Sequence, residues 1–497
     1  MTRYISLTAL AAGGFLAGQA AADLTAAEAW QAFQDANGPT GTMTWDAVEE
    51  GSGSVTATGV TLEMGDSISN IEVAFGTLTF QEAGGAVTLT LEDSIPIEIV
   101  SDFDGVSSNV SGRIELEAAD IRFSGSPEDL TQTYSLGTMR MVLDDLGQAP
   151  DLETFDLVVT LAAMAGETRL TGAETKSAAY TLTADSLTYA IDAGDATDGT
   201  FDMDAVVNGI SLDGTASVPL GFAAFASNAL LADPDYAVDA AFASQSMNIS
   251  ATFSDVGGDG AFEVAAGAGD VTIKLADGEA GYTGGLNGLD VSVVAPDLPL
   301  PVNVSVARYG YRVETPLIPT EDARDMVFGF DILGVTLDDF IWNLFDPGAV
   351  LPRSPADVTL LAELKGRWLI DIMDTEAATT MGADVPIEVE AATISDLRVS
   401  AAGAELTGNG AFTFNNEDLS TFSGLPAPDG AIDLRLVGAN GLIDALIQMG
   451  LLPEDQALGA RMMMGLFMTP AEGPDTLTSR IEVRPDGQVL ANGQRIR

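Results

Sequence analysis

The sequence predicts a mainly β protein, built on a long antiparallel, curved sheet, with one N-terminal helix and a few helices late in the chain. Apolar and polar residues alternate with period two in many short segments, for example in residues 87–92 and 187–192. This pattern gives a strand one dry face and one wet face. Turn signals such as Ala83-Gly84-Gly85 separate the segments, and the 53 glycines suit many tight turns. Short connections between alternating segments indicate antiparallel pairing.

Residues 1–22 have the features of a secretory signal peptide. Arg3 supplies a positive charge, an apolar run extends to Gly18, and small residues lead to Ala22. The run is too short to span a hydrocarbon core of about 30 Å. We expect cleavage after Ala22 and export to the periplasm, with no integral membrane segment in the mature chain.

The mature chain is expected to begin with a helix in residues 23–40. Thr25 and Glu28 have the spacing of a capping box, and Gly38-Pro39 ends the helix. An antiparallel β region then covers residues 41–295. A second β region with covering helices covers residues 296–497.

Four further helices are expected late in the chain. They occupy residues 222–232, 337–345, 442–449 and 453–468. Asn440 is the predicted N-cap of the third, and Pro453 begins the fourth. The last two read as a helical hairpin, after which the chain returns to strand in residues 480–483 and 489–491.

The charge balance limits the partners. The 497-residue chain has 74 acidic and 20 basic residues, which gives a net charge of -54. Nucleic acids and anionic lipid head groups are bound mainly through Lys and Arg. We therefore expect no nucleic-acid partner.

The residue inventory also limits the chemistry. Histidine and cysteine are absent, which excludes His-based and Cys-based catalysis and His-based metal sites. Five aspartates crowd residues 192–204, but Val206 stands where a calcium-binding EF-hand loop starting at Asp195 needs Glu. The sequence predicts no catalytic residue, no cofactor and no metal site.

Two apolar clusters are the candidate ligand-binding residues, with core packing as the alternative role. The first cluster contains Phe340, Trp342 and Phe345, and the second contains Met463 and Phe467. Met-rich surfaces adapt to varied ligands.

One stretch of the chain carries a family resemblance. The segment Ile341-Trp342-Asn343-Leu344-Phe345-Asp346-Pro347-Gly348, followed by Leu351-Pro352-Arg353-Ser354-Pro355, resembles domain-of-unknown-function family 2125, a family of exported alphaproteobacterial proteins. The late helical pair and the closing Asn492-Gly493 add to the likeness. The resemblance implies export and a β-rich body. The family has no established activity, so the resemblance gives no expectation of a reaction.

These observations favour a non-catalytic binding or scaffold protein of the cell envelope. A sheet that curls incompletely leaves an apolar groove, which would suit an acyl chain or an envelope protein partner. Two other functions stay open: a structural protein of the outer membrane or cell surface, and a carboxylate-based enzyme acting on glycans.

Overall fold

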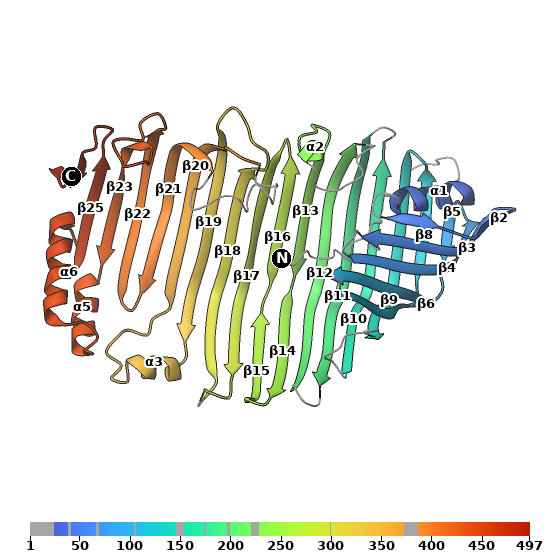
Figure 1. Ribbon diagram of the computed structural model, residues 1–497, viewed down its shortest axis with the longest axis horizontal. Helices are drawn as coiled ribbons and strands as arrows, with labels where there is room; N and C mark the ends of the chain where they lie inside the picture. The colour runs from blue at the N-terminus through green and yellow to red at the C-terminus, as the bar shows by residue number, and fades with distance from the viewer. Residues whose placement is uncertain are drawn as a thin grey trace. The chain divides into compact units, whose positions relative to one another are not determined.

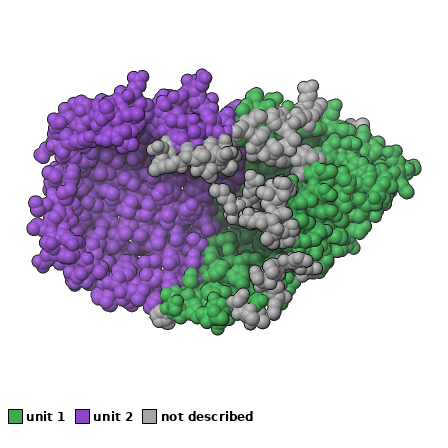
Figure 2. All heavy atoms as spheres, viewed as in Figure 1, with its two compact units in different colours: residues 1–270, 293–299 green, residues 271–292, 300–497 purple. Residues whose placement is uncertain are grey.

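Strands dominate the structure, and they pair in one large antiparallel sheet, as the alternation predicts. The computed structural model describes residues 24–37, 41–65, 69–103, 106–145, 154–172, 175–195, 199–219, 228–298, 300–371 and 386–497. The predicted signal peptide lies outside these residues. The chain forms two compact units, Met1–Asp270 with Val293–Pro299 and Val271–Ser292 with Leu300–Arg497 (Figure 2).

The first part of the chain follows the order helix, then strands with a short helix among them (Figure 1). Its elements are α1 (Ala26–Asn37), β1 (Thr42–Thr44), β2 (Ala47–Gly51), β3 (Ser54–Gly65), β4 (Ser69–Ala83), β5 (Ala86–Thr90), β6 (Ser94–Phe103), β7 (Val106–Glu117), β8 (Asp120–Ser126), β9 (Asp129–Asp145), β10 (Thr154–Thr171), β11 (Thr175–Asp195), β12 (Gly199–Pro219), α2 (Asn228–Leu231), β13 (Ala237–Ser244), β14 (Ser246–Asp255) and β15 (Gly258–Ala266).

The second part consists mainly of strands. One short helix, α3, interrupts them, and two helices, α5 and α6, lie near its end. Its elements are β16 (Gly269–Ala276), β17 (Glu279–Val294), β18 (Val302–Pro316), β19 (Arg324–Leu337), α3 (Asp339–Phe345), β20 (Ala356–Trp368), β21 (Ile387–Ala401), β22 (Ala404–Asn415), β23 (Ala427–Val437), α5 (Ala439–Gln448), α6 (Glu454–Phe467), β24 (Thr469–Pro470), β25 (Thr476–Val483), β26 (Val489–Ala491) and β27 (Gln494–Arg495).

The N-terminal helix confirms its predicted cap. The Thr25 backbone N–H donates to Glu28 Oε2 at 2.9 Å, and the Glu28 N–H donates to Thr25 Oγ1 at 3.2 Å. These two bonds satisfy donors that the first helical turn leaves free. Trp30 on the buried face of α1 packs against Phe80 of β4, with ring centroids 5.6 Å apart. The helix therefore covers part of the sheet in unit 1.

Unit 1 buries its core by closing strands β4 to β9 on themselves. One half of β4 pairs with β6 and the other half with β5. The β6 branch continues through β7 to β9, and the β5 branch continues through β8 to β9. Apolar side chains inside this closed arrangement, among them Phe80, Ile95 and Phe123, are almost fully buried.

In unit 2, strands β18 to β23 and then β25 lie side by side in chain order (Figure 1). Each pairs antiparallel with the next. The α5–α6 hairpin lies beside β25, confirming the predicted pair of helices. The Phe467 carbonyl, at the end of α6, accepts from Ser479 Oγ at 2.7 Å and from Asn492 Nδ2 at 3.0 Å. These bonds fix the hairpin to β25 and the segment after it.

Two helix predictions need correction. Asn440 lies inside α5 rather than at its N-cap, which is Gly438 at φ 76°. Glycine is required there because a Cβ would lie 2.2 Å from the Gly403 carbonyl oxygen. Asn440 Nδ2 donates to Asp475 Oδ1 at 2.7 Å instead. The helix expected over 222–232 is short: α2 covers Asn228–Leu231, and residues 220–227 lie outside the described residues.

Candidate functional site: an apolar sheet face in unit 2

The register of unit 2 sorts its side chains onto two different faces. Residues directly opposite one another in antiparallel strands share a face, and successive residues alternate between faces. One cross-strand row, which we call apolar row 1, is almost entirely apolar. It consists of Tyr311, Phe330, Leu360, Leu397, Gly408, Leu434 and Ser479.

A second apolar row lies two residues away on the same face. We call this apolar row 2, and it crosses the same seven strands without a polar member other than the tyrosine hydroxyl. It consists of Tyr309, Ile332, Val358, Val399, Leu406, Leu436 and Leu477. At about 4.8 Å between neighbouring strands, the two rows span roughly 29 Å. Together they form what we call the apolar face.

The row between them projects to the opposite side and is polar. This polar row consists of Gly310, Asp331, Thr359, Arg398, Thr407, Arg435 and Thr478. Two ion pairs lie on the same face as this polar row. Arg308 Nε is 3.0 Å from Asp331 Oδ2, and Arg398 Nη2 is 3.1 Å from Glu405 Oε2. The two faces of the sheet therefore differ sharply in chemistry.

The apolar face is open. Apart from Ser479, every residue in the two apolar rows is half-buried or exposed, and Tyr309, Phe330 and Val399 each keep about two-fifths of their surface in solvent. Monomeric proteins rarely leave a large contiguous apolar patch exposed unless it binds something. This continuity across seven strands makes the apolar face the leading candidate site.

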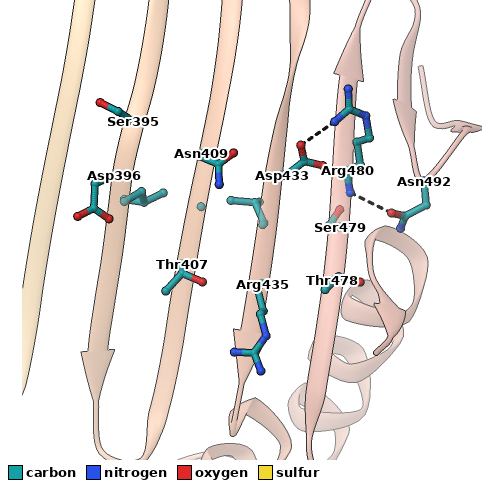
Figure 3. Close-up of a pocket in the computed structure, with 13 residues that line it drawn as sticks. Ser395, Asp396, Thr407, Asn409, Asp433, Arg435, Thr478, Ser479, Arg480 and Asn492 are labelled. Atoms are coloured by element: carbon teal, nitrogen blue, oxygen red, sulfur yellow. Dashed lines mark hydrogen bonds and ion pairs between the residues drawn. The ribbon is translucent and has the colours of Figure 1, made fainter. Parts of the chain in front are cut away.

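The figures identify the apolar face with the hollowed side of unit 2. Figure 2 shows a broad hollow on the face of unit 2 turned toward the viewer. Figure 3 presents the same strands in the reverse left-to-right order, so it looks at the opposite face. The polar side chains Asp433, Arg435 and Arg480 stand on the face in Figure 3. The hollow in Figure 2 is therefore lined by the apolar rows.

A shallow trench of about 480 Å³ lies on the polar face (Figure 3). Thr407 and Arg435 line one side of it, and Asn409, Asp433 and Arg480 line the other. Arg480 Nη1 lies 2.6 Å from Asp433 Oδ2, and this hydrogen bond raises the pKa of Arg480 above its ordinary value. The guanidinium charge is already paired, which leaves little to bind an anion in so acidic a chain.

The second trench, about 550 Å³, crosses β11, β12, β14 and β15 in unit 1. Asp204 and Glu263 are among the residues that line it, together with Tyr189 and Ile249 of the adjacent cross-strand row. Asp192 and Asp202 face each other across neighbouring strands nearby. In the part of the chain that the structure describes, no group of three or more carboxylates is placed to hold a metal ion.

The structure places the predicted ligand-binding residues on helices rather than on the apolar face. Phe340, Trp342 and Phe345 lie on α3, where the Trp342 and Phe345 rings approach to 5.1 Å. Met463 and Phe467 lie on α6. Met463 and Phe345 are exposed, whereas the other three are half-buried.

The α3 cluster is held by polar contacts. Asp338 caps α3, and the bond that its carboxylate accepts from the Ile341 N–H, 2.9 Å, lowers the pKa of Asp338. The Asp346 carboxylate is buried and accepts from the N–H groups of Val350 and Leu351, each at 2.9 Å. Arg353 completes the loop by lying over the Trp342 ring, 5.8 Å from its centroid. The segment with the family resemblance thus fixes the connection from α3 to β20.

Sequence reasoning allowed for an apolar groove but missed the residues that form the apolar face, because it singled out aromatic and Met clusters. The signal was nevertheless present as alternation within each of the strands, for instance Leu434, Leu436 and Ile432 in β23. What alternation lacks is the register that lines up these residues across seven strands.

Within the described residues, no helix has the length and apolarity to cross a membrane. Comparison of the sequence with models of known families and with curated proteins finds no match.

Proposed function

We propose that this chain is a non-catalytic binding protein of the cell envelope that holds an acyl chain, or another extended apolar ligand, on the apolar face of unit 2. The observation that carries the proposal is the pair of open apolar rows across seven strands. Export to the periplasm, and membership of the family that the Trp342–Pro355 region resembles, belong to the same proposal.

The chemistry of the apolar face favours an apolar ligand over a polar one. The rows carry no charged side chain, and the ion pairs that involve the polar row lie on the other side of the sheet. Each methylene that a ligand buries contributes about 0.8 kcal/mol, from which the loss of translational and conformational freedom is subtracted. A long chain lying across several strands can therefore bind by burial alone.

A matched pair of variants tests this proposal. Leu406→Glu places a charge on the apolar face, whereas Thr407→Glu places the same charge on the next residue, which projects from the polar face beside Arg398 and Arg435. Binding of a fluorescent long-chain fatty acid to the purified full chain is measured by titration. We expect Leu406→Glu to weaken binding at least about tenfold, equivalent to 1.4 kcal/mol, and Thr407→Glu to leave it unchanged.

Two controls accompany the titration. Far-UV circular dichroism verifies that both variants keep the strand content of the wild-type protein. Native mass spectrometry with lipid extraction then identifies what co-purifies from the periplasm. Failure of the wild-type protein to bind the probe, or equal weakening by both variants, would reject the apolar face as the binding site.

A further inference from the structure

The two helices of the C-terminal hairpin turn opposite kinds of surface to solvent. On α5, the exposed positions are Gly441, Asp444 and Gln448, which recur at helical spacing and form a polar outer face. This is the ordinary arrangement of a surface helix. Helix α6 differs, because its outer face is apolar.

The anchoring of α6 decides which of its side chains face outward. Ala457 is buried, and Arg461 and Met464 are half-buried, so one stripe at spacings of four and three residues faces the protein. At about 100° per residue, Leu458, Met462 and Leu466 lie well away from that stripe. Their exposed fractions are 61%, 68% and 54%. Met463 beside them is also more than half exposed.

The charges around this apolar stripe are negative. Glu454 and Asp455 form the exposed first turn of α6. The one basic residue of the hairpin, Arg461, has its Nη2 atom 2.6 Å from Asp444 Oδ1, so its charge is already paired. The stripe therefore combines exposed Met and Leu side chains with a negatively charged first turn at the N-terminal end of α6.

We propose that the outer face of α6, made of Leu458, Met462, Met463 and Leu466 with Glu454 and Asp455 at one end, docks an amphipathic helix that is apolar on one side and basic on the other. An apolar face laid against an apolar helix buries both. Methionine side chains adapt to the shape of such a partner. The acidic turn favours a basic partner and disfavours an anionic lipid surface, which needs Lys and Arg on the protein.

The test uses the full chain and two synthetic helical peptides with the same leucine pattern, one with lysine and one with glutamate at its polar positions. Fluorescence anisotropy of the labelled peptides measures binding. We expect the lysine peptide to bind about tenfold or more tightly than the glutamate peptide, and added salt to reduce the difference.

Variants locate the site on α6. The double variant Leu458→Gln/Met462→Gln is expected to weaken binding of the lysine peptide about tenfold or more. Ala460→Gln is the matched control, since Ala460 is exposed on the same helix outside the stripe, and it is expected to bind as the wild type does. Asp455→Asn is expected to weaken binding less than the double variant and to reduce its salt dependence.

Three results would overturn this proposal. Equal binding of both peptides would remove the charge preference. Concentration-dependent dimerisation in sedimentation velocity that the double variant abolishes would show that a second copy occupies the stripe. Binding to zwitterionic vesicles that the double variant abolishes would show that the stripe meets a lipid surface. The fatty-acid titration of the apolar face is independent of all three.

Discussion

Units 1 and 2 use the same alternating strands but treat their apolar faces differently. In unit 1, strands β4 to β9 close on themselves and α1 covers neighbouring strands, so that Phe80 has no solvent exposure at all. In unit 2, strands β18 to β25 run side by side, and the two apolar rows stay open. Alternation thus produces a hydrophobic core where the sheet closes and an open apolar face where it does not.

Unit 1 also buries polar atoms, on β9 and on the neighbouring strand β10. The Tyr134 hydroxyl and Thr168 Oγ1 are buried, and neither has a hydrogen-bond partner among the described residues. Burial raises the pKa of Tyr134 to about 12. Such atoms destabilise a fold, which the apolar burial around them must offset.

The largest expected effect comes from truncating one phenylalanine in each unit. Phe80→Ala removes a fully buried ring and should lower the free energy of unfolding by about 3–5 kcal/mol. Phe412→Ala removes a half-buried ring of β22 that projects from the same side of the strand as Leu406 and Gly408 of the apolar rows, and it should lower the free energy of unfolding by only about 1 kcal/mol. Urea denaturation followed by circular dichroism measures both. Equal losses would mean that the apolar face of unit 2 is packed in solution.

A smaller effect, of opposite sign in the two units, is expected from glycine-to-alanine changes. A Cβ on Gly166 would lie 2.2 Å from Tyr134 Oη and 2.4 Å from the Thr181 carbonyl oxygen. Gly166→Ala should therefore destabilise the chain by about 1–3 kcal/mol. A Cβ on Gly465 of α6 meets no atom within 4 Å, so Gly465→Ala should stabilise it by up to about 1 kcal/mol through helix propensity. Thermal unfolding compares them, and a stabilising Gly166→Ala would contradict the close packing of the Tyr134 side chain of β9 against Gly166 of β10.

The smallest effect concerns acid sensitivity of the α3 connection in unit 2. The N–H groups of Val350 and then Leu351 hold the pKa of Asp346 below its ordinary value, because they bind the charged carboxylate. The contribution of Asp346 is therefore complete above its unfolded pKa of about 3.9 and is lost as the pH falls toward the folded pKa. The Trp342 signal in ¹⁹F NMR of fluorotryptophan-labelled protein should begin to shift below about pH 4.

Asp346→Asn is the control for this pH dependence. The amide cannot titrate, so the acid shift of the Trp342 signal should disappear, and the variant should already be loosened at neutral pH. Identical pH profiles for the wild type and the variant would assign the shift to another group.

Local patterns were enough to predict many elements. The Thr25–Glu28 capping box, the strand at residues 187–192 and the α5–α6 pair all follow from short-range spacing, because caps and amphipathic periods act over a few residues. The start of α5 was misplaced because Gly438 is selected by its close approach to the Gly403 carbonyl, a contact between distant residues. The predicted site residues all lie on helices, because the apolar face is formed by pairing between distant strands, which short-range spacing does not reveal.

By itself, the sequence determined the class of the fold, the acidic charge and the absence of histidine and cysteine chemistry, since composition and period are local properties of the chain. It also determined that each strand has an apolar side. Only the tertiary structure decided what that side meets, because register and closure depend on pairing between residues far apart in the chain. Leu406 and Phe80 belong to the same kind of alternating strand. One lies on an open face and the other in a closed core that α1 also covers, and these long-range contacts separate them.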